Sequence, residues 1–199
     1  IQDTFDGIIN IIKGVFTLNL NEIAIGIQYI GAGLVFYGGL IGGMLAITVY
    51  LRQNNLSWLN IADWVAPYLA LGHSIGRIGC FLVGDDYGKP TESWWGIAFP
   101  QGIPPTHTPV HPTQLFEMAA YFLIFLYLRL SRKNEVIEGN LMFKYLLLVG
   151  FSRFCVEFIR TNPSYMMGLS GAQIISIMMM MIGLFFITKN RNIKKIETI

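Results

Sequence analysis

Charged residues are scarce in this sequence, and their scarcity excludes most soluble folds. Asp, Glu, Lys and Arg make up 13% of the 199 residues, against about 25% in an average soluble domain. Hydrophobic residues make up 53%. The formal net charge is only +2 and no run of like charges occurs, so nothing indicates a nucleic-acid partner. We therefore predict a protein that lies in a lipid bilayer.

Cysteine is equally rare, which limits the chemistry that the thiols can support. Cys80 and Cys155 are far apart and lie in apolar surroundings. This spacing fits neither a disulfide framework nor a structural metal site. We predict no metal ion.

Long uncharged runs, by contrast, are present and predict transmembrane helices. Residues 31–51 and 169–188 each reach the roughly 20 residues that a helix needs to cross the hydrocarbon layer. Weaker apolar segments occur at 62–83, 115–130 and 141–159. The predicted fold is therefore all-α, a polytopic membrane bundle of five transmembrane helices with an extracytoplasmic loop region.

The distribution of basic residues predicts the orientation of this bundle. Positive residues favour the cytoplasmic side of short loops, and they gather after the 115–130 segment and in the tail at 189–199. The predicted organisation is an extracytoplasmic or interfacial segment at 1–30, a bundle at 31–188 with an outer loop at 84–114, and a cytoplasmic tail. The chain begins with Ile1 and no signal-peptide pattern, so we expect it to be a piece of a longer protein.

A few ionisable residues interrupt the apolar segments and predict a polar cavity. Each costs at least ~2.5 kcal/mol at membrane depth, so such groups usually face a bundle interior. His73 and Arg77 lie one helical turn apart, and Arg153, Glu157 and Arg160 follow at helical spacing. Both stripes fall in the outer half of the bundle, together with Tyr37 and the loop residues Asp85, Asp86, His107 and His111.

Two interpretations of these charges follow from the sequence. Arg153, Glu157 and Arg160 can pair with one another and simply fix the helices. Arg77 has no acidic residue one turn away on its own helix, so we predict a cation that receives an anionic ligand. A phospholipid phosphate is the natural candidate, because the planar guanidinium fork matches phosphate oxygens.

Several segments carry a family resemblance. The sequence resembles the bacterial phosphatidylglycerol:prolipoprotein diacylglyceryl transferases in its segments GLVFYGGLIGG (33–43), HSIGRIGCFLVGDDYG (73–88), HPTQLFE (111–117), GFSRFCVEFIRTNP (150–163) and LSGAQIISI (169–177). Such enzymes have seven membrane helices, so the resemblance implies two further helices upstream of this chain.

The resemblance also implies a reaction and its partners. The enzyme would sit in the bacterial plasma (inner) membrane as a multi-pass protein with its active site toward the extracytoplasmic side. It would transfer the diacylglyceryl group of phosphatidylglycerol to the lipobox cysteine thiol in the signal peptide of a preprolipoprotein. No cofactor is implied.

Site residues follow from the family pattern, position by position. Arg77 and Arg153 match arginines implicated in holding the phosphate and in catalysis, and Tyr37 and His111 complete the predicted catalytic set. The predicted substrate-binding residues are His73, Arg77, Cys80, Gly84, Asp85, Gly88, Gln114, Glu117, Glu157 and Arg160.

Two departures from the pattern leave the catalytic base open. Tyr37 stands where the family has a histidine proposed to activate the thiol, and Cys80 stands where it has asparagine. Either His73, His111 or Asp85 supplies the base, or the chain is a divergent relative that binds lipid or acts as a scaffold without catalysis. An anion-conducting protein is a weaker alternative, because it would need charges in the inner half, which we expect to be almost free of them.

Overall fold

The structure, a computed structural model, describes residues 17, 39, 41–135, 137–161, 164–166 and 168–197. The chain divides into two compact units, Ile1–Trp58 and Leu59–Ile199. In the first unit, residues 41–53 are helical, which fits the predicted span at 31–51. Most of the predicted segment at 1–30, and Tyr37, lie outside the described residues.

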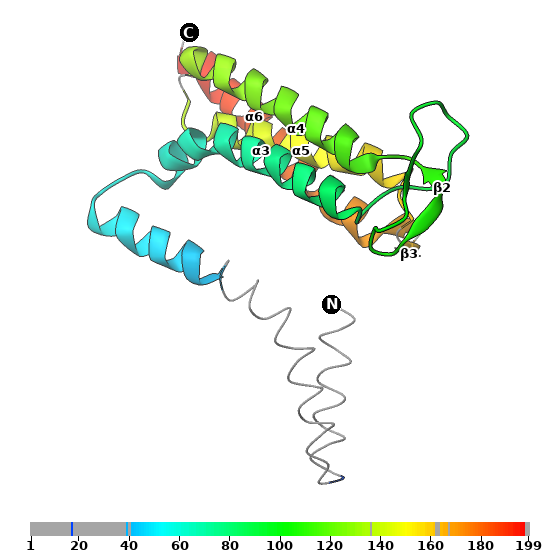
Figure 1. The fold of residues 1–199 in the computed structure, drawn as a ribbon. Coiled ribbons are helices and arrows are strands. Elements are labelled where there is room, and N and C mark those ends of the chain that lie inside the picture. Colours follow the sequence, from blue (N-terminus) through cyan, green and yellow to red (C-terminus); the bar gives the residue numbers. More distant parts are fainter. Residues whose placement is uncertain are drawn as a thin grey trace. The chain divides into compact units, whose positions relative to one another are not determined.

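Four long helices make up the second unit and succeed one another in alternating directions (Figure 1). They are α3 (Trp58–Val83), α4 (Thr113–Ser131), α5 (Asn140–Glu157) and α6 (Gly171–Glu197), with the short η1 (Arg132–Asn134) between α4 and α5. All four were predicted as helices. The bounds differ most for α6, which continues into the predicted tail, and for α3, which begins at Trp58, before the predicted segment at 62–83.

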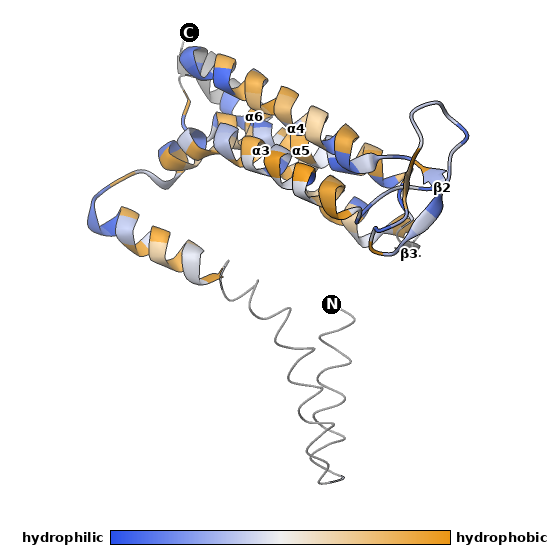
Figure 2. Cartoon of the chain, in the orientation of Figure 1, coloured by the Kyte–Doolittle hydropathy of each residue, from blue (hydrophilic) through white to orange (hydrophobic). Residues whose placement is uncertain are grey.

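Two of these helices are apolar and long enough to cross a membrane by length and composition, α4 over Thr113–Ser131 and α6 over Gly171–Asn190. Large apolar side chains also lie exposed along the helices, such as Leu123 at 64% and Phe185 at 61%. Figure 2 shows hydrophobic residues along the middle of the bundle and hydrophilic residues near its ends. Five spans remain a prediction.

Short strands complete the unit, and the all-α prediction missed them. β1 (Ile97–Phe99) pairs with β2 (Thr106–Val110), and β3 (Ser164–Met166) pairs with β4 (Leu169–Ser170), both antiparallel. Strands of two to five residues are too short to show a clear period-two pattern. They mark one end of the bundle, here called the strand end, and η1 marks the opposite end, here called the η1 end (Figure 1).

Small residues of α3 let the helices of the bundle share one apolar core. Ala66 and Ala70 are completely buried and join larger side chains from α4 and α5, namely Tyr121, Ile124, Leu128, Leu141, Tyr145 and Val149. Because this core fixes α3 against α4 and α5, it also fixes the charged residues that these helices carry toward the strand end.

Glycine allows α5 and α6 to approach most closely. A Cβ added at Gly183 would lie 2.7 Å from the Phe143 carbonyl oxygen, and one at Gly150 would lie 2.9 Å from the Ser176 carbonyl oxygen. Both neighbours are backbone atoms of the facing helix, which cannot move without shifting that helix. Small residues at such contacts are typical of membrane helix pairs.

Replacing Gly183 by alanine should therefore destabilise the protein by about 1–3 kcal/mol, because the added methyl group overpacks the α5–α6 contact. Unfolding in mixed detergent micelles measures this. Gly72→Ala is the matched control, since no described atom lies within 4 Å of a Cβ added there. Equal stability of the two variants would contradict the close approach.

A carboxylate at the η1 end joins α3 to α5. Asp63 accepts the Gly139 N–H at 2.6 Å and the Met142 N–H at 2.8 Å, so it caps a helix that begins elsewhere in the sequence. Asp63 is the second residue of the predicted span at 62–83, so it lies at the edge of that span.

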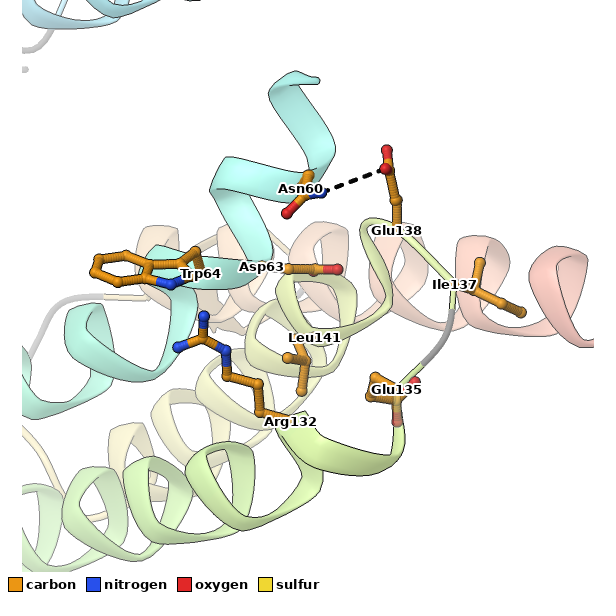
Figure 3. Close-up of a pocket in the computed structure, with 8 residues that line it drawn as sticks. All are labelled: Asn60, Asp63, Trp64, Arg132, Glu135, Ile137, Glu138 and Leu141. Carbon is orange, nitrogen blue, oxygen red and sulfur yellow. Dashed lines mark hydrogen bonds between the residues drawn. The ribbon is translucent and has the colours of Figure 1, made fainter. Parts of the chain in front are cut away.

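The surroundings of Asp63 form a pocket of about 250 Å³, which Figure 3 shows. In it, Asn60 donates to Glu138 at 3.4 Å, and the Arg132 guanidinium lies 5.1 Å from the centre of the Trp64 ring. These polar groups already contact one another or the start of α5. The residues around the pocket are therefore best explained as contacts that fix the α4–α5 connection against α3.

Candidate functional site

A completely buried carboxylate, Glu117 on α4, lies at the centre of the charged residues at the strand end. Its exposure is 0%. Oε2 lies 2.9 Å from Arg77 Nε on α3, and Oε1 lies 2.9 Å from Arg153 Nη1 on α5. Arg160 Nη1, just beyond the end of α5, lies 3.7 Å from Oε2. A single acidic residue therefore gathers three arginines that are far apart in the sequence.

Two more carboxylates balance the remaining positive charge. Glu157 Oε2 lies 2.9 Å from Arg153 Nη2 and 3.9 Å from Arg160 Nε. Asp86 pairs with Arg77 Nη1 at 2.9 Å through one oxygen and with Arg160 through the other. We call these six residues the arginine cluster: Arg77, Asp86, Glu117, Arg153, Glu157 and Arg160.

Arg77 has no acidic residue one turn away on its own helix, as the sequence indicated, but two acidic partners reach it from other elements, Glu117 from α4 and Asp86 from the loop. The predicted pairing of Arg153, Glu157 and Arg160 is present. Buried charges need such partners, because desolvation of an unpaired charge costs several kcal/mol. The cluster has three positive and three negative members, so it is balanced.

Exposure separates the arginines into two kinds. The Arg160 side chain is only 5% exposed, whereas those of Arg77 and Arg153 are 20% and 21% exposed. Glu117 and Glu157 lie beneath them at 0% and 2%. Arg77 and Arg153 are thus held by buried carboxylates on one side and remain accessible to a ligand on the other.

The loop carboxylate is the most exposed member of the cluster. The Asp86 side chain is 43% exposed, and its backbone adopts a positive φ of 59°. Burial acts to raise the pKa of Asp86, but the guanidinium groups of Arg160 and Arg77 outweigh it and hold that pKa below the usual range. Asp86 is therefore ionised at neutral pH.

Glycines shape the turn that presents Asp86 to the arginines. Gly84 has a φ of +71°, and a Cβ added there would lie 2.8 Å from Gly102 Cα. A Cβ added at Gly88 would lie 2.6 Å from the Ile159 carbonyl oxygen. Backbone geometry and close packing explain why both positions hold glycine, and their predicted role in substrate binding stays a prediction.

Residues at the beginning of α4 fix the same turn through hydrogen bonds to its backbone. Thr113 Oγ1 donates to the Asp86 carbonyl oxygen at 2.7 Å, and Gln114 Nε2 donates to the Asp85 carbonyl oxygen. Gln114 is completely buried. This predicted binding residue therefore positions the turn, while the Asp85 side chain keeps a buried oxygen, Oδ1, without a hydrogen-bond partner among the described residues.

Cys80 lies at the edge of the arginine cluster. Its Sγ is 3.6 Å from Arg77 Nη1. Ligand atoms of Cys80, Asp85 and Asp86 lie within 4.8 Å of one another, a spacing that could suit a metal ion. The residues do not fit one, because both Asp86 oxygens pair with arginines whose positive charges would repel it.

The predicted histidines take different places. His73 lies on α3 one turn below Arg77, toward the η1 end, and its Nδ1 is 3.2 Å from the Tyr145 hydroxyl on α5. His111 contacts the loop instead, where Trp95 Nε1 donates to its Nδ1 at 3.2 Å. Within the described residues no ion pair or hydrogen bond connects the His111 ring to the arginine cluster. His107 is exposed on β2.

Sequence reasoning missed several polar residues that support the site. Ser170 Oγ donates to Glu157 Oε1 at 2.6 Å, and Gln173 Oε1 accepts the Ser170 N–H at 3.0 Å. Tyr121 and Tyr145 both contact His73. The signal for Tyr121 is its position one turn from Glu117, a spacing that places both on one face of α4.

Comparison with known proteins gives consistent similarities. The family model for prolipoprotein diacylglyceryl transferase matches residues 8–189. A phosphatidylglycerol–prolipoprotein diacylglyceryl transferase of Clostridium tetani is 38% identical over 165 residues, which cover 81% of this chain and 66% of that protein. A second, from Clostridium perfringens, is 38% identical over 163 residues, covering 81% and 64%. One from Clostridioides difficile is 35% identical over 181 residues, covering 89% and 69%. The chain thus spans slightly less than two thirds of the length of the first two relatives.

Proposed function

Because the chain belongs to the prolipoprotein diacylglyceryl transferase family, we propose that it transfers the diacylglyceryl group of phosphatidylglycerol to the cysteine thiol of a prolipoprotein. The names of its relatives give these two substrates. The observation that carries the proposal is the pair of partly exposed guanidinium groups, Arg77 and Arg153, held on one buried carboxylate.

Phosphate binding follows from the donors that remain on these two arginines. Each guanidinium carries five N–H donors in a fixed plane. Among the described residues, no partner uses Arg77 Nη2 or Arg153 Nε, and each side chain is about one-fifth exposed. These donors can bind the lipid phosphate without breaking the contacts to Glu117. The exposed Asp86 carboxylate can be displaced from Arg77 by that phosphate, which preserves the charge balance.

Catalysis follows from the change of charge during the reaction. As the bond between the glyceryl carbon and the phosphate oxygen breaks, the leaving glycerol phosphate gains one negative charge. Fixed donors that bind this charge more strongly than the ground-state phosphate lower the barrier, by roughly 3–4 kcal/mol for one well-placed donor. Glu117 and Glu157 serve this step by holding the arginines in place.

The position of aromatic and basic residues supports a multi-pass protein with the site on the extracytoplasmic side. Trp64 is 53% exposed near the η1 end, and Trp94 is 91% exposed near the strand end. Tryptophan at both ends is typical of the two membrane–water interfaces. The basic residues Arg132 and Lys133 lie in η1, which supports a cytoplasmic position for that end and a position of the arginine cluster at the outer leaflet of the bacterial plasma membrane.

A lipid-binding protein without catalytic activity is the second candidate. The full charge balance of the arginine cluster favours it, because ion pairs that satisfy one another also fix helices. An assay with liposomes separates the two candidates. We expect the protein in phosphatidylglycerol vesicles to attach a labelled diacylglyceryl group to a lipobox peptide and to release glycerol phosphate.

Two controls make this assay decisive. A peptide with serine in place of the lipobox cysteine should remain unlabelled, and vesicles of phosphatidylcholine should give no product. Retention of labelled lipid without any transfer to the cysteine peptide would leave the non-catalytic function as the correct one.

A further inference from the structure

We propose that His73, supported by Tyr145, removes the thiol proton of the incoming cysteine. This inference rests on the proposed transferase function. It concerns a polar layer below the arginine cluster, one turn toward the η1 end, which phosphate binding does not use. The layer consists of His73 on α3, Tyr121 on α4 and Tyr145 on α5.

Helix geometry places this layer directly beneath the arginines. His73 precedes Arg77 by four residues and Tyr121 follows Glu117 by four. Since α3 and α4 run in opposite directions, both steps lead away from the strand end by about 6 Å. The ring centres of His73 and Tyr121 are 5.4 Å apart, and those of His73 and Tyr145 are 6.1 Å apart.

Tyr145 can orient the imidazole for this role. Its hydroxyl lies 3.2 Å from His73 Nδ1. When Nδ1 carries the hydrogen and donates it to the hydroxyl oxygen, Nε2 keeps a lone pair that can accept a proton. Tyr145 itself is buried at 5% exposure, so its position is fixed by the core, whereas His73 is exposed and accessible.

The carboxylates of the arginine cluster are poor alternatives as bases. Glu117, Glu157 and Asp86 each pair with at least two arginines, so their oxygens are already engaged. A thiol has a pKa of about 8.5, an aspartic acid about 3.9 and an imidazole about 6.5 in water. Proton transfer from a thiol to an imidazole is therefore less unfavourable than transfer to a carboxylate.

The direction of attack distinguishes His73 from the remaining candidates. Sulfur must approach the glyceryl carbon from the side opposite to the leaving oxygen. With the phosphate on Arg77 and Arg153, the diacylglyceryl group extends into the bilayer, toward the η1 end. The thiol must therefore approach from that deeper side, where His73 lies. Asp85 and His111 are loop residues on the phosphate side.

The proposed step is balanced in atoms and charge. Nε2 of His73 takes the proton of the thiol, and the thiolate sulfur forms a bond to the terminal glyceryl carbon. The bond between this carbon and the phosphate oxygen breaks, and glycerol phosphate leaves with the electron pair. The imidazolium then returns its proton to the leaving phosphate or to water.

A selenocysteine acceptor tests the role of His73 separately from folding. A selenol is already ionised at neutral pH and needs no base, so we compare transfer to two lipobox peptides that carry cysteine or selenocysteine. In His73→Gln, we expect transfer to cysteine to fall by about 100-fold, and transfer to selenocysteine to change by only a few-fold. Because both rates come from one preparation, the ratio of the selenocysteine rate to the cysteine rate does not depend on how much protein is folded. We expect this ratio to rise in His73→Gln.

Each other result has a definite meaning. His107→Gln, an exposed loop variant, should keep the ratio of the unsubstituted protein, and so should Asp85→Asn and His111→Gln. An unchanged ratio in His73→Gln, or loss of both activities in a folded His73→Gln protein, would overturn the proposal. A raised ratio in Asp85→Asn instead would assign the base to Asp85. If the unsubstituted protein modifies neither peptide, the transferase function itself fails.

Discussion

Replacing Glu117 by glutamine should destabilise the protein by about 3–5 kcal/mol, because it removes one member of a buried ion-pair network. Glu117 is 0% exposed, and three arginines lie within 4 Å of its oxygens. The neutral amide cannot balance their charge, and its NH₂ group would face guanidinium donors. Equilibrium unfolding in mixed detergent micelles measures the loss.

The matched control for this prediction is Glu92→Gln. Glu92 is an exposed loop residue, so its charge is solvated and its removal should change the unfolding free energy by less than about 1 kcal/mol. If Glu117→Gln also changes stability by no more than this, Glu117 is not the centre of the cluster, and Arg77 and Arg153 are held by other contacts.

Replacing Arg153 by lysine should lower kcat by about 10²–10³-fold with a much smaller effect on stability. Arg153 contacts Glu117 through Nη1 and Glu157 through Nη2, both at 2.9 Å. A single ammonium group keeps the charge but cannot contact both carboxylates and the lipid phosphate in one plane. Loss of one fixed donor to a developing negative charge typically has this magnitude.

Arg77→Lys should show the same defect, because its Nε and Nη1 contact Glu117 and Asp86 in the same way. Arg129→Lys serves as the control, since Arg129 is exposed in the last turn of α4. Transfer of labelled lipid to a lipobox peptide gives kcat, and unfolding measured on the same preparations separates catalysis from stability. Rates within two-fold of the unsubstituted protein for both lysine variants would exclude the two arginines from the reaction.

The positions of the helices and the contacts between them depend on different information. The positions of α3, α4, α5 and α6 could be predicted because apolar runs of about 20 residues are a local property of the sequence. The charge within an apolar run also indicated Arg77 as a candidate site residue, since a charge at membrane depth needs a specific reason, and the family resemblance added Arg153. Helix positions and isolated charges depend only on neighbouring residues and their chemistry.

Partners between helices could not be predicted in the same way. Arg77 and Glu117 are forty positions apart in the sequence, and only the packing of α3 against α4 and α5 brings them to 2.9 Å. The same holds for Asp63, which caps α5 from α3. On its own helix Arg77 has no acidic neighbour one turn away, so the sequence indicated an unpaired cation. In the folded protein, three elements in contact make Arg77 part of a charge-balanced cluster.

An apolar, helical chain, the arginines within its apolar runs and the motifs of its family could thus be predicted from local sequence alone. Folding established which charges neutralise one another, which arginines remain accessible, and that His73 packs against Tyr121 and Tyr145 on the η1 side of the arginine cluster. Hydropathy acts residue by residue, whereas the cost of a buried charge depends on groups that only folding brings close together.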